Sequence, residues 1–228
     1  MTSSRIVEIL YQMIAFLFAI SVHESAHAWT ASRCGDPTAR MLGRVSLNPI
    51  RHIDPIGTIV VPLVAAIRFQ GLIGWAKPTP VDPRNFRHPV MDDILTSVAG
   101  PVSNFIVATG ALLLLGGISL SSVSGHALVM GLAGGFGGAA SDSALAPVAV
   151  LLYGLMIINI WLAVFNLIPV PPLDGSHVLR HFLPDSARIV FDRIGIFALL
   201  ALVFLAPGLL NSLINPPVNL YRLMLVKF

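Results

Sequence analysis

Long apolar stretches alternate with short polar segments along this chain of 228 residues. A helix that crosses the hydrocarbon core of a bilayer needs about 20 apolar residues. Four stretches meet or approach that length, at 6–32, 94–120, 147–168 and 189–206. Because backbone inside a membrane must satisfy its own hydrogen bonds, the pattern predicts an all-α polytopic membrane protein with about four to six transmembrane helices.

Three weaker apolar segments decide how many spans are counted. Segment 56–67 is short and contains a proline, which favours a re-entrant hairpin over a straight crossing. Segment 126–140 is rich in glycine and fits either a loop or a poor span. Segment 209–228 carries two prolines, Pro216 and Pro217, that predict a break, and its polar end suits an interfacial segment.

The only sizeable hydrophilic portion is the loop 33–93 after the first helix. It is rich in proline and glycine and contains short β-prone runs, such as 44–47 and 80–81. We predict a cytoplasmic or re-entrant loop with a small extended or β-containing region. No internal repeat and no second globular portion is visible, so residues 1–228 form one predicted membrane-embedded domain.

Composition supports membrane insertion and excludes a soluble globular protein. Hydrophobic residues make up 55% of the chain and charged residues only 11%, against about 25% charged in typical soluble domains. One cysteine excludes an internal disulfide. Arg5 before an apolar run at the N-terminus resembles a signal peptide, but cleavage would destroy the motif described below, so we reject that interpretation.

The basic residues are concentrated in the first loop rather than spread over a nucleic-acid-binding surface. Eight of the fourteen Lys and Arg lie between the first helix and Ile94, and none lies between Ile94 and Leu179. The positive-inside rule therefore places loop 33–93 in the cytoplasm. We predict a location in the cytoplasmic (plasma) membrane of a prokaryote and no nucleic-acid partner.

The first helix contains the motif H-E-x-x-H as His23-Glu24-Ser25-Ala26-His27. Positions four apart share one helix face, so His23 and His27 are placed to bind one zinc ion, with Glu24 beside a zinc-activated water. Three ionisable groups within a membrane helix are costly unless they serve a site. The motif predicts a peptidase centre at membrane depth.

A catalytic zinc needs a third protein ligand. Asp174 is the favoured candidate, because between Ile94 and Leu179 only Asp142 is also charged, and Asp142 is predicted on the opposite side of the membrane. His177 is the alternative ligand. Asp174-Gly175 on its own fits a plain turn. The third predicted span ends just before Asp174, on the side where the first helix also ends, so the two motifs are predicted to meet.

These motifs together resemble the site-2 protease family of intramembrane zinc metalloproteases, peptidase family M50. The resemblance rests on HESAH at 23–27, NPIRHIDPIGT at 48–58, GWAKP at 74–78, AGPVSN at 99–104 and FNLIPVPPLDGSH at 165–177. It implies that His23, His27 and Asp174 hold one zinc ion per chain, that Glu24 is the general base, and that Asn166 orients the substrate carbonyl or the oxyanion. It also implies transmembrane protein substrates.

Several polar residues leave two interpretations open. Asn166, at a helix end, fits a helix cap as well as a catalytic donor. His52 and Asp54 either form a turn or contact the cavity. Asn104, beside a Gly-Pro pair that favours close helix packing, either supports that packing or hydrogen-bonds a metal ligand. We treat His52, Asn104 and His177 as accessory candidates.

The predicted function is hydrolysis of peptide bonds in or near transmembrane segments. The partners are then membrane lipid and membrane protein substrates. Larger family members carry PDZ or CBS domains for which this chain has no room, so we expect such regulation to come from a partner. The alternative is a non-proteolytic zinc-binding membrane protein, either a transporter or an inactive relative. A His₂Asp site also accepts iron or cobalt.

Overall fold

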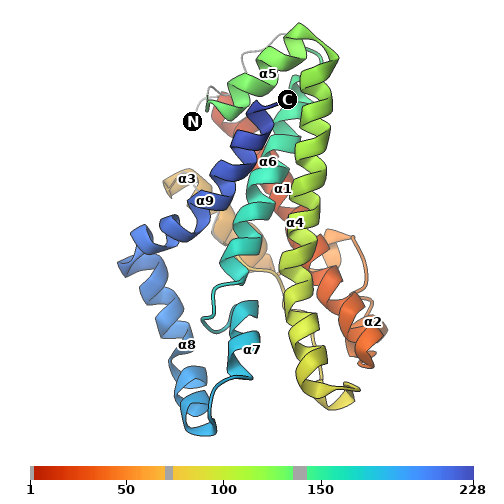
Figure 1. Cartoon of the computed structure of the whole chain (residues 1–228), viewed down its shortest axis with the longest axis vertical. Helices are drawn as coiled ribbons and strands as arrows, with labels where there is room; N and C mark the ends of the chain where they lie inside the picture. Colours follow the sequence, from red (N-terminus) through yellow and green to blue (C-terminus); the bar gives the residue numbers. More distant parts are fainter. Residues whose placement is uncertain (1–2, 70–73, 136–142) are drawn as a thin grey trace.

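The computed structural model describes residues 3–69, 74–135 and 143–228, and its centre is a bundle of three long helices (Figure 1). These are α1 (Ser3–Cys34), α4 (Pro89–Ser121) and α6 (Ala146–Asn166), which pack against one another. Each coincides with a predicted apolar stretch: α1 and α4 extend theirs at both ends, and α6 ends two residues before the predicted end at 168. The long apolar runs form helices because a helix satisfies every backbone group within one segment.

The three bundle helices are long and apolar enough to cross a membrane. A fourth candidate is the pair α8 (Asp185–Leu205) and α9 (Pro207–Val226), whose apolar parts meet at a bend of 81°. The described residues therefore contain three candidate spans, or four if the bent pair counts as one. The predicted number of four to six spans is not confirmed. The protein is an integral membrane protein.

The break predicted at Pro216 and Pro217 is wrong, because α9 continues through both prolines. The chain bends instead at Ala206, just before the helix begins. Helix α9 packs against α4, α5 and α6, and it buries one stripe of side chains: Leu210, Ile214, Val218 and Leu225. This packing stabilises a helix that its prolines alone would disfavour.

The loop between α1 and α4 contains short helical elements joined by non-helical segments, among them 74–82. The helical elements are α2 (Thr38–Met41), a 3₁₀ turn η1 (Pro49–Arg51), a π-helical turn η2 (Pro55–Val60), α3 (Val61–Phe69) and a 3₁₀ turn η3 (Pro83–Asn85). The described part of this loop contains no β-strand, so the predicted β-containing region is not confirmed, and η2 with α3 occupies the predicted re-entrant segment 56–67.

An Asx-Pro pair begins each of the three η turns. Asn48, Asp54 and Asp82 each precede a proline and accept hydrogen bonds from backbone N–H groups two or three residues later. An Asx side chain caps a helical turn, and proline is favoured at its first position. These capping signals therefore account for where the η turns begin, while the β-prone runs 44–47 and 80–81 lie outside the turns and form no strand.

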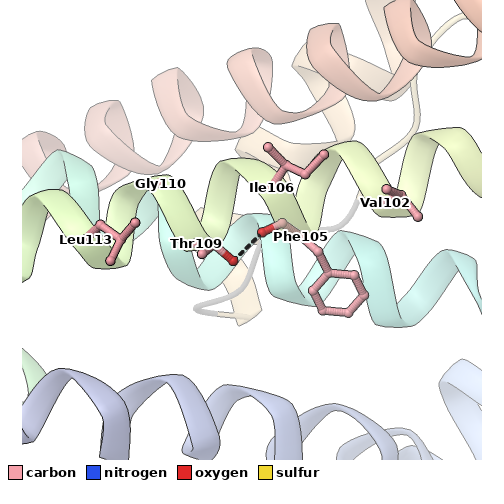
Figure 2. A pocket seen from close by; sticks show the side chains of 6 residues that line it. All are labelled: Val102, Phe105, Ile106, Thr109, Gly110 and Leu113. Atoms are coloured by element: carbon pink, nitrogen blue, oxygen red, sulfur yellow. Dashed lines mark hydrogen bonds between the residues drawn. The ribbon is translucent and has the colours of Figure 1, made fainter.

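Helix α5 (Val123–Ala133) follows α4 after a turn at Ser122, whose hydroxyl accepts a hydrogen bond from the Gly125 amide. It occupies the first half of segment 126–140, and the rest of that segment from residue 136 lies outside the described residues. An open apolar depression of about 470 Å³ lies along the outer face of α4, lined by Val102, Phe105, Ile106, Thr109, Gly110 and Leu113 (Figure 2). It contains no titratable side chain and therefore carries no acid-base chemistry.

Candidate metal centre

Helix α1 presents His23 and His27 one turn apart on the face that packs against the bundle. Both imidazoles are buried, and their Nε2 atoms lie 3.0 Å apart. Glu24 follows His23 directly, so its side chain leaves the helix about 100° further round and is only partly buried.

Asp174 reaches the two imidazoles from a different part of the chain. Helix α6 ends at Asn166, a non-helical connection follows, and Asp174 begins the short helix α7 (Asp174–Arg180), which packs against α4. The Oδ2 atom of Asp174 lies 3.1 Å from Nε2 of His23 and 3.3 Å from Nε2 of His27. The structure thus brings together the three predicted ligands.

Hydrogen bonds to the far side of each imidazole set its tautomer. Nδ1 of His27 lies 2.7 Å from the carbonyl oxygen of Thr96, which only accepts, so Nδ1 carries the proton. Nδ1 of His23 lies 2.6 Å from Oδ1 of Asn104. The amide nitrogen of Asn104 donates to the Ala19 carbonyl and to Oδ1 of Asn159, which fixes Oδ1 as the acceptor for His23.

Three electron-rich atoms therefore converge on one point. Both Nε2 atoms carry lone pairs, and Oδ2 of Asp174 is buried without a hydrogen-bond donor. The three atoms lie within 4.8 Å of one another, and no other such trio occurs among the described residues. Lone pairs repel unless a cation or a proton lies between them, and two imidazoles with a carboxylate form a ligand set typical of catalytic zinc. The residues fit a zinc ion.

Electrostatics favours the ionised form of Asp174. Burial raises the pKa of its carboxyl, whereas charge interactions and hydrogen bonds with His27 and His23, which require a proton on an imidazole Nε2, lower it below its usual range. A cation at the same point would favour the carboxylate in the same way. Asp174 is thus a carboxylate, which is the form that binds metal.

One face of helix α4 packs against the two imidazoles. Its contacts come from three residues spaced four positions apart, Thr96, Gly100 and Asn104. Thr96 contacts His27 and Asn104 contacts His23, while Gly100 lies between them. A Cβ atom on Gly100 would lie 2.6 Å from Cε1 of His23 and closer still to Nε2 of His27. Glycine is therefore required here to let α4 approach both rings, which gives the Gly-Pro pair a role at the centre as well as in packing.

Glu24 is held by the loop before α4. Its Oε2 atom accepts hydrogen bonds from the Thr79 amide at 2.9 Å and from the Thr79 hydroxyl at 2.7 Å. The hydroxyl also lies 3.1 Å from the Glu24 carbonyl oxygen. The carboxylate that the motif predicts as general base is thus fixed by one residue outside the motif.

The remaining candidates lie in other arrangements. Asn166 donates its amide to the Leu162 carbonyl of its own helix. His52 is fully buried, with Nε2 against the Ser46 carbonyl, and is not part of the trio.

Asp54 caps η2, as the turn interpretation expects. His177 is half-exposed and lies near Asp93 rather than among the three ligand atoms. The Asp93 carboxylate raises the pKa of His177, against the opposing effect of burial.

Three contributors to the site were not found from the sequence. Asn159 is a fully buried amide within apolar α6, and a polar residue in a predicted span is a signal that could have indicated it. Thr96 contributes only its backbone carbonyl, for which side-chain identity gives no signal. Thr79 stands between two prolines in a loop, where its contact depends on the course of the chain.

The fold and the site define a helical membrane protein with a candidate His₂Asp metal centre. The profile of peptidase family M50 matches residues 11–206. "Putative zinc metalloprotease YwhC" of Bacillus subtilis is 37% identical over 78% of this chain and 71% of its own length. The chain belongs to peptidase family M50, a metalloprotease family, which confirms the resemblance to site-2 proteases.

More distant relatives carry a similar name. "Putative zinc metalloprotease Rip2" of Mycobacterium tuberculosis strain H37Rv is 30% identical over 85% of this chain and 66% of its own length. Its namesake in Mycolicibacterium smegmatis is 27% identical over 76% of this chain and 58% of its own length. No solved structure matches the chain significantly.

Proposed function

We propose that this protein is an intramembrane zinc endopeptidase that hydrolyses peptide bonds in or near transmembrane segments of other membrane proteins. The observation that carries the proposal is the convergence of His23, His27 and Asp174 beside Glu24 on a helix apolar enough to span a membrane. Family membership supports the same chemistry.

The chain's own residues divide the work at the centre. His23, His27 and Asp174 would hold the zinc ion, and Asn104 with the Thr96 carbonyl keeps both imidazoles in the ligating tautomer. A bound zinc ion supplies Lewis acidity that activates water and polarises the scissile carbonyl.

Glu24 accepts the proton of the attacking water and passes it to the leaving amine. Asn166, at the end of α6, orients the substrate carbonyl. Its amide nitrogen carries two hydrogens, and the bond to Leu162 uses one. The second hydrogen is then available to the substrate.

The substrate must present an extended backbone, because every carbonyl within a helix is already hydrogen-bonded. The non-helical segment 74–82 lies beside Glu24 and provides a surface along which an unwound segment would lie. The substrates are therefore single-span or polytopic membrane proteins with a locally unstable helix.

The proposed orientation places the centre toward the cytoplasm of a prokaryotic cell. The basic loop between α1 and α4 lies toward the same end of the bundle as α7 (Figure 1), and the positive-inside rule assigns that end to the cytoplasm. The named relatives are bacterial. Regulation is expected from a partner protein.

Metal content and cleavage, measured together, test the function. The purified proteins would be wild type, Glu24→Gln and Asp174→Ala, with Glu8→Gln as the matched control, because Glu8 is exposed on the same helix. We expect wild type and Glu8→Gln to hold about one zinc and to cleave a panel of single-span substrates. Glu24→Gln should keep zinc and lose cleavage, and Asp174→Ala should lose zinc. If Glu24→Gln behaves as wild type in every assay, the protein is a zinc-binding or transport protein instead.

A further inference from the structure

The segment 74–82, named the strap here, contacts Glu24. Thr79 is its point of contact: two donors from this one residue converge on Oε2 of Glu24. Because both hydrogen bonds go to Oε2, they restrict rotation of the Glu24 carboxylate. Neither bond uses Oε1, which is then the oxygen for proton transfer.

The prolines on either side make this contact specific. Pro78 and Pro80 have no amide N–H, so Thr79 has the only one in the three-residue stretch, and it is used on Glu24. The strap therefore cannot exchange this bond for a neighbouring one by slipping along the chain. The same prolines restrict the backbone on both sides of Thr79.

One end of the strap is anchored to the η turns. The Trp75 amide donates to the Gly57 carbonyl at 3.0 Å, and the buried Thr58 hydroxyl donates to the Trp75 carbonyl at 2.7 Å. The Lys77 amide donates to the His52 carbonyl at 2.9 Å. A Cβ atom on Gly57 would overlap the Trp75 indole, so that ring packs directly on the glycine.

The other end is anchored to the turn that follows α1. Asp36 is fully buried, and its carboxylate accepts hydrogen bonds from the Asp82 amide at 2.8 Å and from the Asn85 side chain at 2.9 Å. Thr38 donates two more, from its amide and its hydroxyl. The strap is thus tied at both ends, and Thr79 lies between the ties.

We propose that Thr79 is a positioning residue that holds the general base Glu24 in its working rotamer, with the doubly anchored strap as its support. This inference rests on the proposed function. The Glu24 side chain can adopt several rotamers on its helix. A general base that is already held in the reactive rotamer needs no reorganisation when the water attacks. A mutation can remove the Thr79 hydroxyl while the Thr79 backbone amide and its bond to Glu24 remain.

Kinetics of two Thr79 variants test the proposal. Thr79→Val keeps the volume and the amide but removes the hydroxyl, and Thr79→Ser restores it. Thr109→Val is the matched control: its hydroxyl lies 2.8 Å from the Phe105 carbonyl oxygen (Figure 2) and 2.8 Å from the Tyr221 hydroxyl of α9, and neither belongs to the candidate metal centre. For Thr79→Val we expect kcat to fall by about 10- to 100-fold, with KM and zinc content unchanged, and Thr79→Ser to recover most of the loss. A wild-type kcat in Thr79→Val, or an equal loss in Thr79→Ser, would overturn the assignment.

A double-mutant cycle on thermal midpoint gives a readout independent of activity. The variants are Thr79→Val, Glu24→Ala and their combination, each with zinc bound. If the hydroxyl donates to Glu24, the two single shifts do not add, because each removes the same interaction. Additive shifts in a protein that cleaves substrate would overturn the Thr79 assignment alone. A wild type that holds zinc, cleaves nothing and still shows non-additive shifts would overturn the proposed function and leave the contact in place.

Discussion

Oδ1 of Asn104 lies 2.6 Å from Nδ1 of His23 and thereby connects the metal centre to the helix that packs beside it. The same amide donates to Asn159 on α6, at 2.7 Å. One buried side chain thus ties α1, α4 and α6 together at the depth of the proposed ligands. Since buried amides are costly when unpaired, this network specifies how the three helices are aligned.

Replacing Asn104 by leucine should weaken zinc binding by about 10- to 100-fold, because His23 loses the acceptor that fixes its tautomer. Asn159 also loses its donor. The measurement is zinc affinity by competition with a chelator. Thr109→Val, on the same helix, should leave the affinity unchanged. An unchanged affinity in Asn104→Leu would show that His23 needs no partner on α4.

Adding one methyl group at Gly100 should abolish metal binding, because a Cβ there would overlap both imidazoles. Gly110→Ala is the matched control: it lies on the same helix, and a Cβ there meets nothing within 4 Å. Alanine at Gly110 should keep zinc and stabilise the helix slightly, by about 0.5–1 kcal/mol. Metal content and thermal midpoint of both variants test the prediction, which fails if Gly100→Ala retains a full zinc ion.

Removing the metal should lower the thermal midpoint of the wild type. Without zinc, the ligand atoms of His23, His27 and Asp174 repel one another. The stabilisation by bound zinc, about 2.7 kcal/mol when zinc is at a hundredfold excess over its Kd, is also lost. Thermal unfolding with and without a chelator measures this. Asp174→Ala should show no chelator effect, and an equal midpoint for wild type in both conditions would contradict the metal centre.

The buried Asp36 carboxylate should make stability sensitive to acid. Burial raises the pKa of Asp36, but hydrogen bonds from Thr38, Asp82 and Asn85 outweigh this and lower the pKa below its usual range. The folded state then favours the ionised form, so the stabilisation is complete above about pH 4 and is lost as the pH falls through the lowered pKa.

Asp36→Asn should reduce the free energy of unfolding by about 1–3 kcal/mol at neutral pH and flatten the acid dependence. Asp185, whose side chain is 95% exposed, provides the control Asp185→Asn. Thermal midpoints from pH 7 to pH 3 test both variants. An Asp36→Asn curve parallel to that of the wild type would contradict the role of this carboxylate.

The sequence by itself determined the three apolar bundle helices and the residue types of the candidate centre. Helices of this length follow from composition alone, because lipid leaves the backbone no other partner. The spacing of His23 and His27 is local, so helix geometry predicts their common face. The association of Asp174 with them followed from charge and hydropathy, which assign helix ends to sides of the membrane.

Only the tertiary structure decided how these residues are held. The continuation of α9 through Pro216 depends on packing against other helices. The contacts of Thr79 with Glu24 and of Asn104 with His23 join residues 55 and 81 positions apart. Such contacts arise where separate segments meet in space, and neither periodicity nor local spacing contains that information.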